Sequence, residues 1–133
     1  MNEKELIDSA VAAMKSSYSP YSGFSVGAAL LTCSGRIYTG CNIENSSYSI
    51  TMCAERTALF KALSEGERDF EAIAIVGGRD GRITDGCPPC GACLQAMSEF
   101  CGGDFTILLF DGDNVNKHTL GSLLPESFKI KKQ

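Results

Sequence analysis

Apolar residues recur along the first part of the chain at the spacing of a helix. Between Glu3 and Ser16 they fall three or four positions apart, which predicts an amphipathic helix with Leu6, Ile7, Ala10, Val11 and Met14 on its buried face. Residues 24–32 and 36–43 are strand-like in composition, and the turn formers at 33–35 separate them. Two strands joined by a short turn predict a β-hairpin.

Helical and strand-like segments alternate along the rest of the chain. Helices are predicted over 53–63 and 90–100 and apolar strands over 70–76 and 105–110, with a short strand near 118–120 and a short helix near 122–124. The segment 79–89, which contains several glycines and prolines, is interpreted as a loop. Nearly continuous apolar strands are typical of strands covered on both faces, and the helices supply crossovers for parallel pairing. The pattern predicts an α/β fold whose mixed sheet has helices on both faces.

Length and composition narrow the class of protein. The chain has 133 residues, 44% of them hydrophobic, which predicts one domain over residues 1–133. No apolar run approaches the roughly 20 residues of a membrane-spanning helix, and the first residues lack the layout of a secretion signal. We therefore expect a cytoplasmic protein without a membrane partner. The net charge of −4 argues against nucleic acid as a partner.

The cysteines are the most informative residues. There are seven, beside a single histidine, and an odd count without a secretion signal favours metal ligands or reactive thiols over disulfides. Two segments concentrate them, Cys53-Ala54-Glu55-Arg56 and Cys87-Pro88-Pro89-Cys90-Gly91-Ala92-Cys93. Each lies at a predicted helix start, where unpaired N–H groups favour thiolates. Two sulfurs from a CxxC pair and one from the other helix would leave an open position on a bound ion, as in catalytic zinc sites.

Other interpretations of the cysteines are open at this stage. The spacings from Cys87 to Cys90 and from Cys90 to Cys93 both fit a redox pair, and a closed site of four cysteines including Cys87 would hold structural zinc. Free cysteines are also common in protein cores. We expect packing roles for three cysteines outside the two segments, which are Cys33, Cys41 and Cys101.

Glu55 adds a group suited to proton transfer. It follows Cys53 by two residues, in the first turn of a predicted helix, where its carboxylate could lie beside a water activated by zinc. The alternative is an exposed glutamate that only complements the helix dipole.

Together these segments resemble the zinc signature of the cytidine deaminase family, in which Cys53-Ala54-Glu55 is followed by Pro89-Cys90-Gly91-Ala92-Cys93. Residues 20–30, 40–48 and 123–128 are similar to further blocks of that family. Cysteine at position 53 resembles the small homotetrameric branch. The resemblance implies a three-layer α/β/α fold around a mixed five-stranded sheet.

The resemblance also implies a reaction. One Zn²⁺ per subunit would be held by Cys53, Cys90 and Cys93, and Glu55 would protonate N3 of the base and then carry a proton to the departing amine. Cytidine and deoxycytidine would become uridine and deoxyuridine with release of ammonia, a step of pyrimidine salvage. Arg56 would donate to the ligand sulfurs; the alternative is an exposed helix arginine.

Substrate contacts are implied as well. The expected substrate-binding residues are Phe24, Asn42, Glu44, Ala54, Tyr48 and Phe128. Asn42 and Glu44 resemble a ribose-binding pair, and the Glu44 carboxylate would favour a nucleoside over a nucleotide. Tyr48 and Phe128 would reach an adjacent subunit's site in a homotetramer. The sequence departs from the family at Leu94, where arginine is common.

Two further hypotheses compete with this one. A related enzyme could deaminate another aminopyrimidine, such as a nucleoside-like antibiotic. A zinc module without activity could instead bind partners or nucleic acid, although the chain has no basic patch for the latter.

Overall fold

A computed structural model describes residues 1–132, apart from the side chain of Asp85. Along these residues the elements run α1 (Glu3–Met14), β1 (Ser25–Thr32), β2 (Ile37–Cys41), the 3₁₀ helix η1 (Tyr48–Ile50), α2 (Ala54–Ser64), β3 (Phe70–Arg79), β4 (Arg82–Asp85), α3 (Gly91–Phe100), β5 (Thr106–Phe110), β6 (Val115–Thr119) and α4 (Leu120–Leu123). The expected helices and strands occur in the expected order, with η1 and β4 in addition, and α1 ends two residues before the predicted Ser16.

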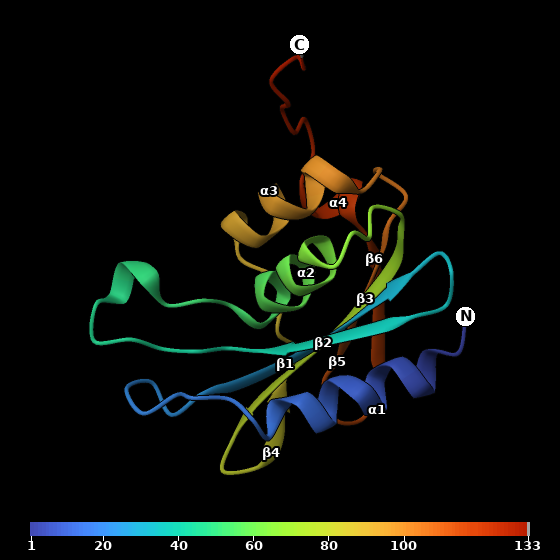
Figure 1. The fold of residues 1–133 in the computed structure, drawn as a ribbon. Coiled ribbons are helices and arrows are strands. Elements are labelled where there is room, and N and C mark those ends of the chain that lie inside the picture. The colour runs from blue at the N-terminus through green and yellow to red at the C-terminus, as the bar shows by residue number, and fades with distance from the viewer. Residues whose placement is uncertain (133) are drawn as a thin grey trace.

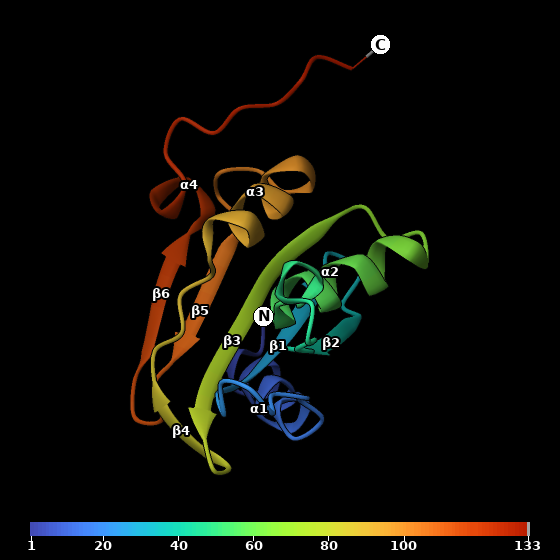
Figure 2. The same ribbon diagram turned by 90° about the vertical axis from the view of Figure 1, so that its left-hand side faces the viewer.

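The strands form one mixed sheet in the order β2-β1-β3-β5-β6, with β4 paired to β3 (Figures 1 and 2). β1 is antiparallel to both β2 and β3, which confirms the hairpin. β3 and β5 are parallel, as expected for strands joined by a crossover through α3. β6 closes the sheet as an antiparallel neighbour of β5.

The expected number of five strands is wrong, because part of the predicted loop 79–89 forms a sixth strand, β4. Asp80 and Gly81, between β3 and β4, have φ angles of 53° and 74°. Positive φ at both central residues defines a type I′ turn, whose twist matches that of paired strands. The dipeptide Asp-Gly therefore folds β4 back onto β3.

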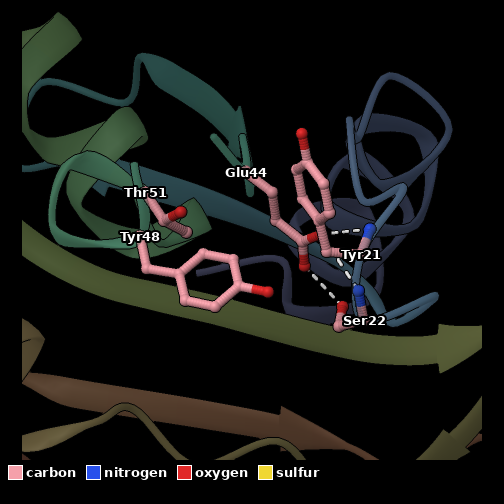
Figure 3. A pocket seen from close by; sticks show the side chains of 5 residues that line it. All are labelled: Tyr21, Ser22, Glu44, Tyr48 and Thr51. Atoms are coloured by element: carbon pink, nitrogen blue, oxygen red, sulfur yellow. Dashed lines mark hydrogen bonds between the residues drawn. The ribbon is translucent and has the colours of Figure 1, made fainter. Parts of the chain in front are cut away.

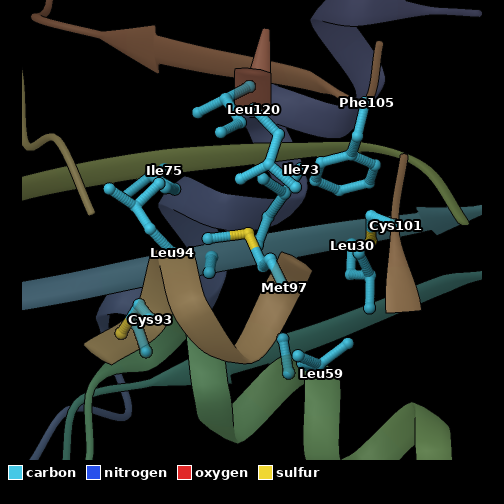
Figure 4. Close-up of a cluster of buried hydrophobic side chains, with 14 of the residues drawn as sticks. Leu30, Leu59, Ile73, Ile75, Cys93, Leu94, Met97, Cys101, Phe105 and Leu120 are labelled. Carbon is cyan, nitrogen blue, oxygen red and sulfur yellow. The ribbon is translucent and has the colours of Figure 1, made fainter. Parts of the chain in front are cut away.

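Helices cover both faces of the sheet, which confirms the three layers. α1 lies on one face, and α2, α3 and α4 lie on the other (Figure 1). Successive residues of β3 alternate between two apolar clusters. Ile73 and Ile75 pack toward α2 and α3 (Figure 4), whereas Ala74 and Val76 pack toward α1. This alternation explains why the strand is apolar on both faces.

α2 lies unusually close to β2. A Cβ added at Gly40 would lie 2.5 Å from the Ala58 nitrogen and 2.6 Å from the Ala54 oxygen. Only glycine leaves room for the helix backbone at this distance. The close packing fixes the height of the first turn of α2 above the sheet, where Cys53 and Glu55 are located.

The remaining cysteines have different surroundings. Cys101 is buried in the core, as expected, and burial raises the pKa of its thiol to about 12. Cys41 is half-buried at the end of β2. Cys33 is exposed after the end of β1, so the expectation that it packs in the core is wrong.

None of the described helices combines the length and the apolar character that a membrane-spanning helix needs.

Candidate active site

Three cysteine sulfurs meet where α2 and α3 begin. Cys53 is the N-cap of α2, Cys90 is the N-cap of α3, and Cys93 lies in the first turn of α3. The Sγ atoms of Cys53 and Cys90 are 3.9 Å apart, those of Cys90 and Cys93 are 3.6 Å apart, and all three lie within 4.8 Å of one another. The spacing in the sequence therefore brings together the three sulfurs that it predicted.

This geometry fits zinc. Two sulfurs bonded to one zinc ion at about 2.3 Å and at a tetrahedral angle are about 3.8 Å apart. The two observed separations lie on either side of that value. Cys87 is not part of the group, so in the described part of the chain three sulfurs converge and not the four of a closed structural site.

The surroundings favour a thiolate at Cys53. Hydrogen bonds from Cys93 and Arg56 lower the pKa of Cys53 to about 5. Cys93, by contrast, has a raised pKa, because its thiol donates to Cys53 and is buried. The sulfurs thus compete for protons, and a cation that replaced the shared proton would be stabilised by the same contacts.

Arg56 and Glu55 both lie beside this cluster. Arg56 Nη2 donates to Cys53 Sγ over 3.5 Å, and Arg56 is half-buried, which does not fit the alternative of an exposed helix arginine. Glu55 is only 4% exposed, and burial raises the pKa of its carboxyl to about 7. A glutamate that only complemented a helix dipole would lie in solvent. Glu55 instead lines a pocket beside the sulfurs.

This inner pocket, of about 250 Å³, contains most of the candidate residues. Its walls are formed by Phe24, Val26, Asn42, Thr51, Met52, Cys53, Ala54, Glu55, Cys87, Pro88 and Cys90. The expected residues Phe24, Asn42 and Ala54 therefore line the same pocket as Cys53 and Cys90. Cys87, whose position in the site the sequence left unresolved, forms part of the same wall, and burial raises the pKa of its thiol to about 11.

The Asn42 side chain lines the pocket and also holds neighbouring backbone groups by hydrogen bonds. Its Oδ1 accepts hydrogen bonds from the Val26 amide and the Ser17 hydroxyl, and its Nδ2 donates to the Phe24 carbonyl over 2.8 Å. An asparagine side chain has two donor hydrogens and two acceptor positions. One N–H of Asn42 thus has no partner among the described residues and is left for a ligand.

A second, outer pocket of about 290 Å³ shares Thr51 with the first (Figure 3). Glu44 lies in this pocket and accepts hydrogen bonds from the backbone amides of Tyr21 and Ser22, at 2.9 and 3.1 Å, and from the Ser22 hydroxyl. The Ser22 hydroxyl lowers the pKa of Glu44, which keeps the carboxylate ionised. Sequence reasoning assigned no individual role to Tyr21 or Ser22, which entered it only as part of the block 20–30 that resembles the family.

Comparisons with known proteins agree with this geometry. Residues 1–109 match the family described as "Cytidine and deoxycytidylate deaminase zinc-binding region". The chain belongs to this deaminase family. A cytidine deaminase of Sporosarcina psychrophila is 48% identical over 130 residues, which cover 96% of this chain and 92% of that protein. One from Halalkalibacterium halodurans is also 48% identical, over 96% of this chain and 95% of that protein. The crystal structure of cytidine deaminase from Burkholderia pseudomallei aligns with a TM-score of 0.88 at 44% identity, covering 96% of this chain and all of that one.

Zinc is accordingly the cofactor of this member of the deaminase family, as the matched zinc-binding region and the three-cysteine cluster both indicate. Leu94, where the family commonly has arginine, is 7% exposed and packs in the core between α3 and the sheet. The Leu94 side chain thus contributes to core packing. Among the described residues, Arg56 is the cation that contacts a sulfur of the cysteine cluster.

Two residues that the family resemblance assigned to shared sites lie at the surface of this deaminase chain. Tyr48 is 73% exposed, and its ring packs edge-on against Tyr21, with centroids 6.0 Å apart, at the mouth of the chain's own outer pocket. Phe128 is 67% exposed and lies in the C-terminal segment that extends away from the sheet (Figure 2). Its carbonyl accepts a hydrogen bond from Gln95 Nε2.

Proposed function

We propose that this chain is a zinc-dependent hydrolase that converts cytidine and deoxycytidine to uridine and deoxyuridine with release of ammonia, in pyrimidine salvage. The observation that carries the proposal is one pocket bounded by two of three converging cysteine sulfurs and by a buried carboxyl group. The high identity to cytidine deaminases over nearly the whole chain supports it. The whole chain acts as one catalytic domain, since one sheet joins residues from β1 to β6.

Each residue has a defined task in this reaction. Cys53, Cys90 and Cys93 hold the zinc ion, which supplies the Lewis acidity that makes water a nucleophile near neutral pH. Glu55 takes a proton from the attacking water and delivers it to N3 of the base. It then takes the second proton from the new hydroxyl on C4 and delivers it to the amine, which leaves as ammonia while the C4 carbonyl forms. Its burial keeps bulk water from taking over these transfers.

The remaining pocket residues bind and orient the nucleoside. Phe24 packs on the base and the Ala54 backbone contacts it in the inner pocket. The free N–H of Asn42 donates to the ribose, and Glu44 accepts from a ribose hydroxyl in the outer pocket. Because Glu44 is held ionised, it repels a phosphate on the same edge of the sugar, which favours nucleosides over nucleotides.

The enzyme works as a cytoplasmic homotetramer in this proposal. Tyr48 and Phe128 are large, exposed rings, and exposed apolar side chains of this kind support contacts with a neighbouring chain. The seven cysteines are free, which suits a reducing compartment. Size-exclusion chromatography with light scattering measures the mass directly, and a monomer at working concentrations would contradict the tetramer without affecting the assignment of the reaction.

One assay tests the reaction. Loss of cytidine absorbance and release of ammonia are followed for the wild type, Glu55→Gln, and the control Glu65→Gln at the exposed C-cap of α2, with the zinc content of each protein measured. We expect Glu55→Gln to keep zinc and lose activity by about 10²-fold or more, and Glu65→Gln to keep both. Wild type that contains zinc but converts neither nucleoside would overturn the proposal, and turnover of only a nucleoside-like antibiotic would favour the related deaminase.

A further inference from the structure

We propose that Arg79 is a positioning residue that holds the base-stacking Phe24 and the Ser22–Glu44 contact in place for nucleoside binding, an inference that rests on the proposed function. Arg79 is the last residue of β3, and the type I′ turn at Asp80 and Gly81 follows it and leads into β4. It is far from Phe24 and Ser22 in the sequence and reaches them only because β3 pairs with β1.

Two contacts join Arg79 to the segment that leads into β1. Its Nη1 donates a hydrogen bond to the Ser22 carbonyl over 2.7 Å. Its guanidinium carbon lies 5.5 Å from the centre of the Phe24 ring, within the range of a cation–π interaction. A planar guanidinium can make both contacts at once, whereas an ammonium group has no flat face to lay on the ring.

The segment that Arg79 contacts carries two parts of the pocket. The Phe24 amide donates to the Ser22 hydroxyl over 3.0 Å, and that hydroxyl donates in turn to Glu44. Phe24 lines the inner pocket and Glu44 lines the outer one. A single arginine thus fixes the backbone on which both pockets depend.

The neighbouring glycines fit this arrangement. Gly23, between the two contacted residues, has a φ of +69°, and a Cβ there would lie 3.2 Å from Arg79 Nη1. A Cβ at Gly77, two residues before Arg79 on β3, would lie 2.8 Å from Phe24 Cζ. Both glycines leave space that the arginine and the phenylalanine ring occupy.

The hairpin itself does not explain an arginine at position 79. Arg79 is paired directly with Arg82 across the β3–β4 turn. Like charges directly opposite each other on antiparallel strands destabilise the pair. The arginine is therefore unfavourable for the hairpin, and its contacts with Ser22 and Phe24 supply the reason for it.

The test compares Arg79→Gln with Arg82→Gln, which removes the same charge from the opposite position of the same hairpin. Arg79→Lys keeps the charge without the flat guanidinium. We expect Arg79→Gln to raise KM for cytidine about 5- to 10-fold with kcat changed less than about 2-fold, since a cation–π contact and one charge-assisted hydrogen bond are lost. The KM of Arg79→Lys should lie between those of Arg79→Gln and the wild type, and the KM of Arg82→Gln should match that of the wild type.

Two further measurements separate positioning from general stability. In a Phe24→Leu background, Arg79→Gln should change KM less than about 2-fold, because the ring through which it acts is gone. Hydrogen exchange of the Ser22 and Phe24 amides should accelerate in Arg79→Gln but not in Arg82→Gln, and this measurement needs no turnover. Equal exchange in the two variants, or equal KM values, would overturn the inference. Inactive wild type would instead overturn the proposed function, and exchange would still decide the role of Arg79.

Discussion

The Arg56 guanidinium donates a hydrogen bond to the Cys53 thiol at the start of α2, over 3.5 Å between Nη2 and Sγ. Three thiolates around a divalent cation carry a net negative charge, which weakens the ability of the metal to acidify water. The N-termini of α2 and α3 offset part of that charge. Arg56 offsets more of it, and Leu94 offsets none, because it is buried in the core.

We predict that Arg56→Ala loses zinc to a chelator about 10-fold faster than the wild type and has lower activity, as is typical when a partner of a metal ligand is removed. The measurement is the rate of zinc transfer to a coloured chelator. Arg82→Ala is the control, since Arg82 is exposed on β4. If the two variants release zinc at the same rate, Arg56 has no role beyond that of a surface arginine.

Cys90 and Cys87 are three residues apart and both line the inner pocket, yet they should respond differently to substitution. Cys90 belongs to the group of converging sulfurs and Cys87 does not. We predict that the zinc content of Cys90→Ala falls well below about one zinc per chain, the content of a single site, whereas Cys87→Ala retains its zinc. Metal analysis of both folded proteins provides the comparison. Equal loss from the two variants would favour the closed four-cysteine site.

Much of the fold could be predicted from local patterns. The strand β3 and the helix α3 were predicted because a run of apolar residues and a helical period are properties of contiguous residues. The strand β4 was missed because the glycines and prolines of 79–89 suggested a loop. The signal was present in Asp80-Gly81, whose positive φ angles define the turn.

The site was predictable where its chemistry depends on spacing. Cys90 and Cys93 share one helix start, so their convergence follows from the sequence. The contact of Arg79 with Ser22 joins residues far apart in the chain, and it depends on the register between β1 and β3, which a single sequence does not encode locally. The location of Cys87 in the pocket wall depends likewise on tertiary packing.

Ser22 controls the ionisation of Glu44. Its hydroxyl donates to the carboxylate and lowers the pKa of Glu44. The ionised carboxylate therefore stabilises the native state at pH values above the ordinary pKa of glutamate. This stabilisation is lost as the pH falls through the lowered pKa of the native state. We predict that Ser22→Ala raises the pKa of Glu44 toward its ordinary value, with part of the shift kept by the two backbone amides. Carbon-13 NMR titration measures it. Ser46→Ala, which removes a hydroxyl beside Tyr21 instead, is the control, and an unchanged Glu44 titration in Ser22→Ala would refute the prediction.

Gly40 links the packing of the fold to the metal site. A Cβ at this position would collide with the backbone of α2 at Ala54 and Ala58, so Gly40→Ala must push the helix away from β2. We expect a loss of about 1–3 kcal/mol, the range for overpacked cores, together with faster zinc release, because Cys53 moves with the helix start. Gly86→Ala is the matched control, since an added Cβ there meets none of the described atoms beyond its chain neighbours within 4 Å. Thermal unfolding and chelator transfer measure the two effects. A variant that lost stability but released zinc at the wild-type rate would show that the helix start adjusts independently of its contact with β2.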